Sequence, residues 1–291
     1  MQQVISSWRG YLELTKPGVQ ALLFVSCISG MLIGSDFNPP IDVFIFGLLG
    51  VSFLAASAAV INHIFDQKID AKMIRTASRP IVVGEISNRQ ATVFSFILYV
   101  SGSWMLLYFA NPLTWVLTTL TFIFYGFIYT RYLKFMTSQN IVIGGLAGAM
   151  PPLLGWTAVS NSVEPNALLL VLIVMVWTPP HFWALAVHRV EDYSEAAVPM
   201  LPVQKGVDFT KQHILLYTIL LCVCTMLPYA VRMFNEIYLV SAAILGSIFL
   251  YYSIRLLRDE TNSYAMPTFA YSLIYLALLF VAMLTDYFLY L

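Results

Sequence analysis

Nine runs of about twenty predominantly apolar residues divide this chain, and they constrain its fold more than any other feature. A helix needs roughly 20 such residues to cross a hydrocarbon layer about 30 Å thick. Inside lipid every backbone N–H and C=O group must be paired within the protein, which favours helices. The chain is therefore expected to fold as an all-α polytopic membrane protein with nine transmembrane helices. The predicted spans cover residues 18–34, 43–61, 91–110, 113–130, 141–160, 167–187, 214–231, 237–254 and 267–285.

The composition supports the same class. Hydrophobic residues make up 59% of the 291 residues and charged residues only 10%, against roughly 25% charged in a soluble domain. Acidic and basic residues balance, so the net charge of zero gives no reason to expect a nucleic-acid partner. The three cysteines provide no disulfide framework. We expect a single integral membrane domain over residues 1–291, with lipid around it.

The fifteen Lys and Arg residues test the number of spans, because cytoplasmic loops of membrane proteins are enriched in cations. With nine spans and a cytoplasmic N-terminus, every cation except Arg232 falls on the cytoplasmic side. This distribution predicts a cytoplasmic N-terminus, a C-terminus outside, and insertion into the cytoplasmic (inner) membrane.

The loop after the second span carries the first candidate site. If the span continues as a helix, Asn62, Asp66 and Asp70 follow one another at intervals of four residues. Each interval rotates the side chain by only about 40° and advances it about 6 Å, so the three oxygens form one stripe. Such oxygens are ligands for Mg²⁺, whose shell is usually shared with substrate phosphates. Three cations follow at once: Lys72, Arg75 and Arg79. A solvated loop at the membrane surface is the alternative interpretation.

A second polar loop follows the sixth span and, like the first, carries acidic residues. It places His188 and Asp192 four residues apart, and four spans separate the two loops, so both open on the same side. Two acidic stretches with cations and no zinc-ligand spacing predict a site for Mg²⁺ and a diphosphate leaving group. A site that opens into lipid favours an allylic prenyl diphosphate, whose carbocation aromatic faces would stabilise.

The pattern Asn62-x-x-x-Asp66-x-x-x-Asp70 after a second span resembles the first signature of the UbiA-type intramembrane prenyltransferases. Other segments resemble one branch of that family, the heme O synthases (protoheme IX farnesyltransferases). They are Thr15-Lys16-Pro17, the residues from Asp70 to Pro80, Tyr129 to Lys134, Asn140 to Trp156, Trp177 to Ala186, and Asp192 to Gly206. The resemblance covers residues 15 to 220, whereas the last two spans share only hydropathy.

The resemblance implies transfer of a farnesyl group from farnesyl diphosphate to a vinyl group of heme b, with Mg²⁺ as cofactor. It implies Asn62, Asp66, Asp70 and Asp192 as metal ligands. The implied catalytic residues are Asp66, Asp70, Asp192 and Lys134. The implied substrate-binding residues are Lys72, Arg75, Arg79, Tyr129, Arg131, Lys134, Trp177, His181 and Tyr193, of which His181 is the expected heme contact.

Two positions depart from the family pattern. Phe135 stands where the family usually has Arg, so the clamp is expected to depend more on Arg131 or Arg79. His188 stands where a second Asp-x-x-x-Asp motif would begin, which puts the coordination of a second metal in doubt.

Three other functions fit parts of the pattern. A UbiA-type enzyme with an aromatic acceptor, a hydroxybenzoate or a naphthoate, fits the same motifs. A transporter would place its ionisable residues near the membrane midplane on broken helices, and Pro179-Pro180 could break a span. An assembly subunit without chemistry would have no reason to concentrate acids and cations at one membrane face. If the product is heme O, heme A synthase or the assembly of a terminal oxidase is an expected partner.

Overall fold

The computed structural model describes residues 7–291, and every regular element in that range is helical. The N-terminal half contains α1 (Trp8–Leu14), α2 (Pro17–Ile33), η1 (Val43–Gly47), α3 (Leu48–Asp70), α4 (Asn88–Phe109), α5 (Pro112–Ile123), η2 (Phe124–Leu133) and α6 (Lys134–Met136). The remainder contains α7 (Asn140–Ala149), α8 (Pro151–Ser160), α9 (Pro165–His188), α10 (Val190–Glu195), α11 (Leu201–Lys205), α12 (Val207–Cys224), α13 (Leu227–Ala230), α14 (Glu236–Arg258) and α15 (Ala265–Leu289). η1 and η2 are π-helical.

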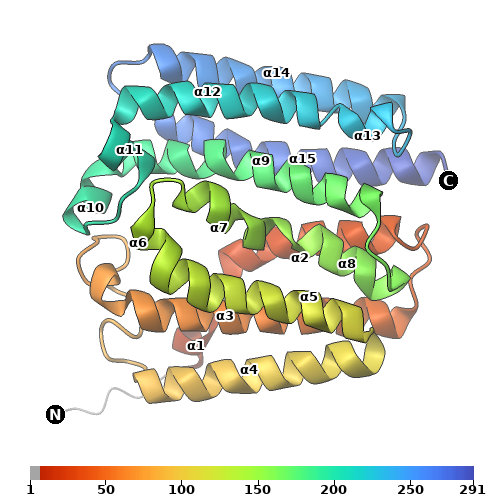
Figure 1. Ribbon diagram of the computed structural model, residues 1–291, viewed down its shortest axis with the longest axis horizontal. Helices are drawn as coiled ribbons and strands as arrows, with labels where there is room; N and C mark the ends of the chain where they lie inside the picture. The colour runs from red at the N-terminus through yellow and green to blue at the C-terminus, as the bar shows by residue number, and fades with distance from the viewer. Residues whose placement is uncertain (1–6) are drawn as a thin grey trace.

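The long helices form a membrane-spanning bundle (Figure 1). Among the described residues, eight helical segments are long and apolar enough to cross a membrane. A ninth span results if α1 and α2, which meet at 54°, are counted together. The predicted all-helical membrane fold is thus confirmed, with α2 as its shortest span. The described chain begins and ends at opposite ends of the bundle, as an odd number of spans requires.

Prolines mark where the spans break and where they do not. The predicted span 141–160 consists of α7 and α8, which meet where Pro151 and Pro152 remove two backbone N–H donors. By contrast, α9 runs without interruption through Pro179 and Pro180. The broken helix that a transporter would need at these two prolines is therefore not formed.

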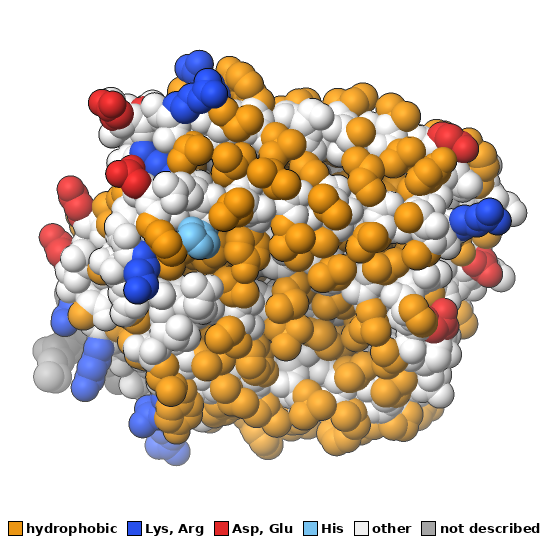
Figure 2. All heavy atoms as spheres, turned by 45° about the horizontal axis from the view of Figure 1, so that its top comes forward, with side chains coloured by type: hydrophobic (Ala, Val, Ile, Leu, Met, Phe, Trp, Pro, Cys, Tyr) orange, Lys and Arg blue, Asp and Glu red, His pale blue; other side chains and the backbone are white. Residues whose placement is uncertain are grey.

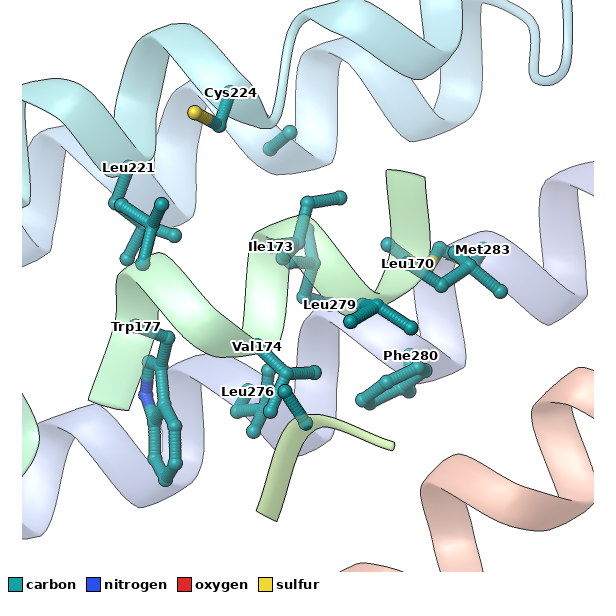
Figure 3. Close-up of a cluster of buried hydrophobic side chains, with 14 of the residues drawn as sticks. Leu170, Ile173, Val174, Trp177, Leu221, Cys224, Leu276, Leu279, Phe280 and Met283 are labelled. Atoms are coloured by element: carbon teal, nitrogen blue, oxygen red, sulfur yellow. The ribbon is translucent and has the colours of Figure 1, made fainter. Parts of the chain in front are cut away.

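Apolar packing between α9, α12 and α15 forms the core of the C-terminal half (Figure 3). Ile173 and Trp177 of α9 belong to this cluster together with Leu221 of α12 and Leu279 of α15. These side chains are almost fully buried. The core holds the second half rigid and fixes the position at which α9 emerges toward the second polar loop.

The polar loops lie together at one end of the bundle. The end of α3, the segment around α6, and helices α10 and α11 share the left end in Figure 1. In Figure 2 most Lys and Arg side chains gather at that end, beside a broad hydrophobic band. The predicted clustering of both loops at one end is therefore confirmed. We refer to this end as the polar rim.

Candidate active site at the polar rim

The last two turns of α3 carry the predicted acidic stripe. The helix continues unbroken to Asp70, which confirms the condition on which the stripe depended. Asn62, Asp66 and Asp70 are each only 4% exposed. Carboxylates are almost never buried without a compensating partner, so the partners of these three residues define the chemistry of the site.

Asn62 is the centre of a hydrogen-bond network that reaches two other segments, the start of α2 and η2. Its Nδ2 donates to Asp66 Oδ2 at 2.9 Å and to Thr130 Oγ1 at 3.1 Å. Its Oδ1 accepts from Lys16 Nζ at 2.5 Å, which brings the start of α2 against the end of α3. The Thr130 hydroxyl in turn donates to the Tyr125 carbonyl oxygen at 2.7 Å, so its oxygen is left to accept from Asn62. The orientation of the Asn62 amide is therefore fixed from both sides.

Lys134 brings a second cation to this network, and it pairs with Asp66. Its Nζ donates to Asp66 Oδ2 at 2.9 Å, and both side chains are mostly buried. Asn140 Nδ2 donates to the Lys134 backbone oxygen at 3.0 Å and holds the turn that follows η2. π-Helical segments are rare and often occur at functional sites. Here η2 supplies Thr130 and, at its end, Lys134 to the same carboxylate network.

The two oxygens of Asp66 differ. Oδ2 accepts from Asn62 and from Lys134, whereas Oδ1 is buried and has no hydrogen-bond partner among the described residues. A buried carboxylate oxygen without a partner is costly and calls for an explanation. Such an oxygen is a ready ligand for a hard cation.

Asp70 is held by the loop that follows it. Arg79 Nη1 lies 2.5 Å from Asp70 Oδ2, and the Thr76 hydroxyl donates to the Asp70 backbone oxygen at 3.0 Å. This fold of residues 71–79 returns the basic segment onto the end of α3.

A cavity of about 340 Å³ lies between the start of α2, the end of α3 and this loop. Lys16, Arg75 and Arg79 contribute three cations to its wall and Glu13 one acid, while His63 and Thr76 also line it. We call this cavity the rim chamber. Its size and charge fit the head group of an anionic ligand such as a diphosphate.

The second polar loop meets the first, as the sequence predicted. Met73 of the first loop and Tyr193 of the second belong to one buried cluster. Burial raises the pKa of the Tyr193 hydroxyl, and the positive charge of nearby Arg75 opposes this rise. Asp192 Oδ2 forms an ion pair with Arg189 Nη1 at 3.6 Å and, among the described residues, has no hydrogen-bond partner.

The carboxylate oxygens of the rim fit Mg²⁺ if a phosphate ligand supplies further oxygens to the coordination shell. Within residues 7–291, no group of three or more His, Cys, Asp and Glu side chains is placed to hold a metal by itself. Mg²⁺ commonly binds through one or two carboxylates, several waters and substrate phosphates, so such a group is not required. The partnerless oxygens Asp66 Oδ1 and Asp192 Oδ2 are the available carboxylate donors.

Four other positions singled out in the sequence lie at the edge of the rim. Arg131 is exposed and its guanidinium lies 5.5 Å from the centre of the Phe65 ring. Lys72 and His188 are exposed. Phe135 is also exposed, and Lys134 reaches Asp66 without help from a neighbouring Arg. Arg79 bonds to Asp70 and Arg131 contacts Phe65, so the expected dependence of the diphosphate clamp on Arg131 or Arg79 stays a prediction.

Tyr129 stacks on Tyr125, with ring centroids 5.8 Å apart and an angle of 12° between the planes. Its ring presses against Gly144, where an added Cβ would lie only 2.3 Å from a ring carbon. The glycine in α7 therefore allows the aromatic pair to sit beside the rim.

Trp177 and His181 lie inside the bundle, at the contact between α9 and α15. The two rings stack with their centroids 4.3 Å apart, and the Phe269 ring also stacks on His181, with centroids 4.6 Å apart. Ser272 Oγ donates to the Phe269 backbone oxygen, so it accepts from His181 Nδ1 at 2.6 Å. That bond fixes the tautomer with the proton on Nδ1 and leaves Nε2 as an acceptor.

Several site residues were not assigned by sequence reasoning. Lys16 stood in a recognised motif, and its position as a lone cation just before a span was the signal that could have revealed it. Thr130 and Asn140 are uncharged, and only three-dimensional contacts show their role. His63 was not assigned to the site.

The geometry defines a polytopic membrane protein with a buried site of acids and cations at one end of its bundle. Residues 23–280 match the model of the UbiA prenyltransferase family, so the chain belongs to that family. It is an enzyme of the prenyltransferase class.

Two similar proteins are both named protoheme IX farnesyltransferase. The one from Saccharophagus degradans is 52% identical over 285 residues, covering 98% of this chain and 94% of its own. The one from Hahella chejuensis is 53% identical over 283 residues, covering 97% and 95%.

Two solved structures share the fold. A structure described as digeranylgeranylglyceryl phosphate synthase has a TM-score of 0.80 at 24% identity and covers 96% of this chain and 98% of its own. A UbiA homolog from Archaeoglobus fulgidus, bound to DMAPP and Mg²⁺, has a TM-score of 0.67 at 17% identity and covers 94% and 98%.

Proposed function

We propose that this protein transfers the farnesyl group of farnesyl diphosphate to a vinyl group of heme b, giving heme O. The observation that carries the proposal is identity above 50%, over nearly the whole chain, to proteins named protoheme IX farnesyltransferase. The rim chamber, joined through Lys16 and Asn62 to Asp66 and its partnerless oxygen, supplies the matching chemistry for a prenyl diphosphate.

The cations of the rim bind and neutralise the diphosphate. Lys16, Arg75 and Arg79 converge on the rim chamber, where they stabilise the negative charge that grows as the C1–O bond breaks. Lys134 is held in place by Asp66 and lies where the ammonium can act on the same leaving group. Because these groups are already in position, little reorganisation accompanies bond breaking.

Asn62, Asp66, Asp70 and Asp192 are the residues that would hold Mg²⁺. When bound, the metal adds positive charge next to the departing diphosphate. Support comes from the partnerless oxygens of Asp66 and Asp192 and from the Mg²⁺ bound by the homolog from Archaeoglobus fulgidus. Removal of the metal with a chelator should stop turnover, and added Mg²⁺ should restore it.

The farnesyl carbocation then reacts with heme. Its C1 forms a bond to one vinyl carbon, and a water oxygen adds to the other vinyl carbon and releases a proton. The bundle excludes bulk water from the ionised chain until that step, and the Tyr125–Tyr129 pair presents aromatic faces beside the rim. Trp177, His181 and Tyr193 are the residues we assign to binding of the acceptor.

An acceptor competition tests this assignment. The purified protein is given farnesyl diphosphate and Mg²⁺ together with equal amounts of heme b, 4-hydroxybenzoate and a naphthoate, and the products are identified by mass spectrometry. We expect only hydroxyethylfarnesyl heme. A prenylated benzoate or naphthoate with unmodified heme would overturn the heme assignment and leave the prenyltransferase class intact.

The site belongs at the cytoplasmic face of the inner membrane, because the predicted cytoplasmic segments carry the rim and fourteen of the fifteen cations. Labelling of single cysteines in the loop of residues 71–79 by a membrane-impermeant reagent should require disrupted cells. Heme A synthase or a terminal oxidase under assembly is the expected recipient of the product.

A further inference from the structure

His63 occupies the inner wall of the rim chamber. It lies three residues before Asp66 and seven before Asp70 on α3, and these spacings place it on the same helical face as the acids. It is 2% exposed, yet it lines the chamber together with Lys16, Arg75 and Arg79. The imidazole is therefore a buried group that faces a cation-lined cavity.

The His63 ring has no hydrogen-bond partner in the part of the chain that the structure describes. Both Nδ1 and Nε2 are buried, and neither makes a hydrogen bond. His181 provides a contrast, because its Nδ1 is bonded to Ser272 at 2.6 Å. Buried polar atoms in folded proteins nearly always have a partner, so two unpartnered nitrogens on one ring point to a ligand.

The charges around the chamber identify the chemistry of that ligand. Three cations oppose the single acid Glu13, so the chamber favours an anion. An imidazole carries at least one N–H in every protonation state found in water, so His63 always has a donor for an anionic oxygen. Lys16 lines the chamber and also bonds to Asn62 at 2.5 Å, which connects the chamber directly to the acid network.

From these contacts, and resting on the proposed function, we infer that His63 binds the diphosphate of the prenyl substrate through a ring N–H. Its hydrogen bond to a phosphate oxygen comes from the buried side of the chamber. Lys16, Arg75 and Arg79 line the same chamber, and among them Arg75 is in contact with solvent. His63 thus fixes the depth at which the head group sits, and with it the position of the C1–O bond relative to Asp66.

The experiment measures binding rather than turnover. Full-length protein in lipid nanodiscs is titrated calorimetrically with farnesyl thiolodiphosphate, an unreactive analogue, in the presence of Mg²⁺. We compare His63→Phe, which keeps an aromatic ring without a donor, with His63→Asn, which keeps an N–H donor. His213→Ala, at a partly exposed histidine of α12 that bonds to its own helix, is the matched control.

We expect His63→Phe to lower the affinity for the analogue by about tenfold, which is the loss typical of one hydrogen bond to a charged group. His63→Asn should recover most of the affinity, and His213→Ala should bind like the wild type. Equal affinity for His63→Phe and the wild type would overturn the inference. Thermal unfolding of each variant shows whether it is folded. If His63→Phe is not, His63→Leu, which also lacks an N–H donor, takes its place with the same expected loss of affinity.

A spectrum of bound heme separates this inference from its main rival. If His63 instead ligated the heme iron, His63→Phe would shift the Soret band and leave analogue binding unchanged, which would also overturn the inference. The proposed function fails separately, if the wild-type protein binds neither the analogue nor heme b.

Discussion

Two buried carboxylates at opposite ends of the bundle show how a structural acid differs from a functional one. Asp286 of α15 is fully buried, and its oxygens accept from the backbone N–H groups of Asn235 at 2.6 Å and Tyr238 at 3.0 Å. These donors lie at the start of α14, where backbone N–H groups lack partners within the helix. Asp286 therefore caps the N-terminus of α14, and each of its oxygens accepts a hydrogen bond.

Asp66 at the polar rim is equally buried but only half satisfied. One oxygen accepts from Asn62 and Lys134, while the other has no partner among the described residues. Burial without full pairing lowers stability, so such an arrangement persists where a ligand completes it. The comparison predicts that changes at Asp66 affect chemistry and that changes at Asp286 affect folding.

The largest effect is expected from Asp66→Asn. The substitution preserves the shape of the side chain but removes the charge that would hold a metal. Turnover should therefore fall by about a hundredfold to a thousandfold. The thermal midpoint should change little, because the asparagine amide fills the same space and its oxygen can still accept from Asn62 and Lys134. Product formation measured by mass spectrometry, alongside thermal unfolding in detergent, checks both statements. Normal turnover would dismiss the assignment of Asp66 to the metal site.

The opposite pattern is expected from Asp286→Ala. Loss of the carboxylate leaves two buried N–H groups without acceptors and should lower the free energy of unfolding by about 2 kcal/mol. Activity per folded molecule should stay near that of the wild type, since Asp286 lies at the far end of the bundle. Loss of activity in a fully folded sample would remove the distinction between the two acids.

A smaller effect on chemistry is expected from Thr130→Val. The hydroxyl bonds to both Asn62 and the Tyr125 carbonyl, and its removal releases the Asn62 amide. We expect kcat/KM to fall by about tenfold, the scale of one lost buried hydrogen bond. Thr130→Ser retains the hydroxyl and serves as the matched control. If valine and serine gave the same rate, the hydroxyl would have no part in positioning Asn62.

The smallest effect concerns Asp259, an exposed acid in the loop before α15. Hydrogen bonds from the Thr261 hydroxyl and the Tyr264 backbone N–H hold the pKa of its carboxyl below the usual range. A lowered pKa in the folded state adds stability above the unfolded-state pKa of about 3.9, and this stability is lost as the pH falls through the folded-state value. Asp259→Asn should therefore lower the unfolding midpoint slightly at pH 7, and the difference should shrink in acid. A difference that grew as the pH fell would contradict this sign.

The sequence predicted the features of the site that depend on local spacing. The apolar runs gave the membrane spans, and the four-residue intervals placed Asn62, Asp66 and Asp70 on one face of α3, because helix geometry follows directly from sequence separation. The cations of the same loop were also expected at the rim.

The sequence could not predict contacts that depend on how distant helices pack. Lys16 lies 46 residues from Asn62, and only the packing of α2 against α3 brings them together. His181 was expected at heme, but its partner Ser272 belongs to a span that the sequence described only by hydropathy. The π-helical geometry of η2, which presents Thr130 to Asn62 and ends just before Lys134, also had no sequence signal.

A single-turnover reaction in ¹⁸O-labelled water tests the central claim most directly. Purified protein in nanodiscs is mixed with heme b, farnesyl diphosphate and Mg²⁺, and both the released diphosphate and the heme products are quantified by mass spectrometry. We predict one diphosphate for each hydroxyethylfarnesyl heme, with the label in the new hydroxyl group. Release of diphosphate with unmodified heme and labelled farnesol would contradict the account, because the rim would then ionise the substrate without transferring it to heme.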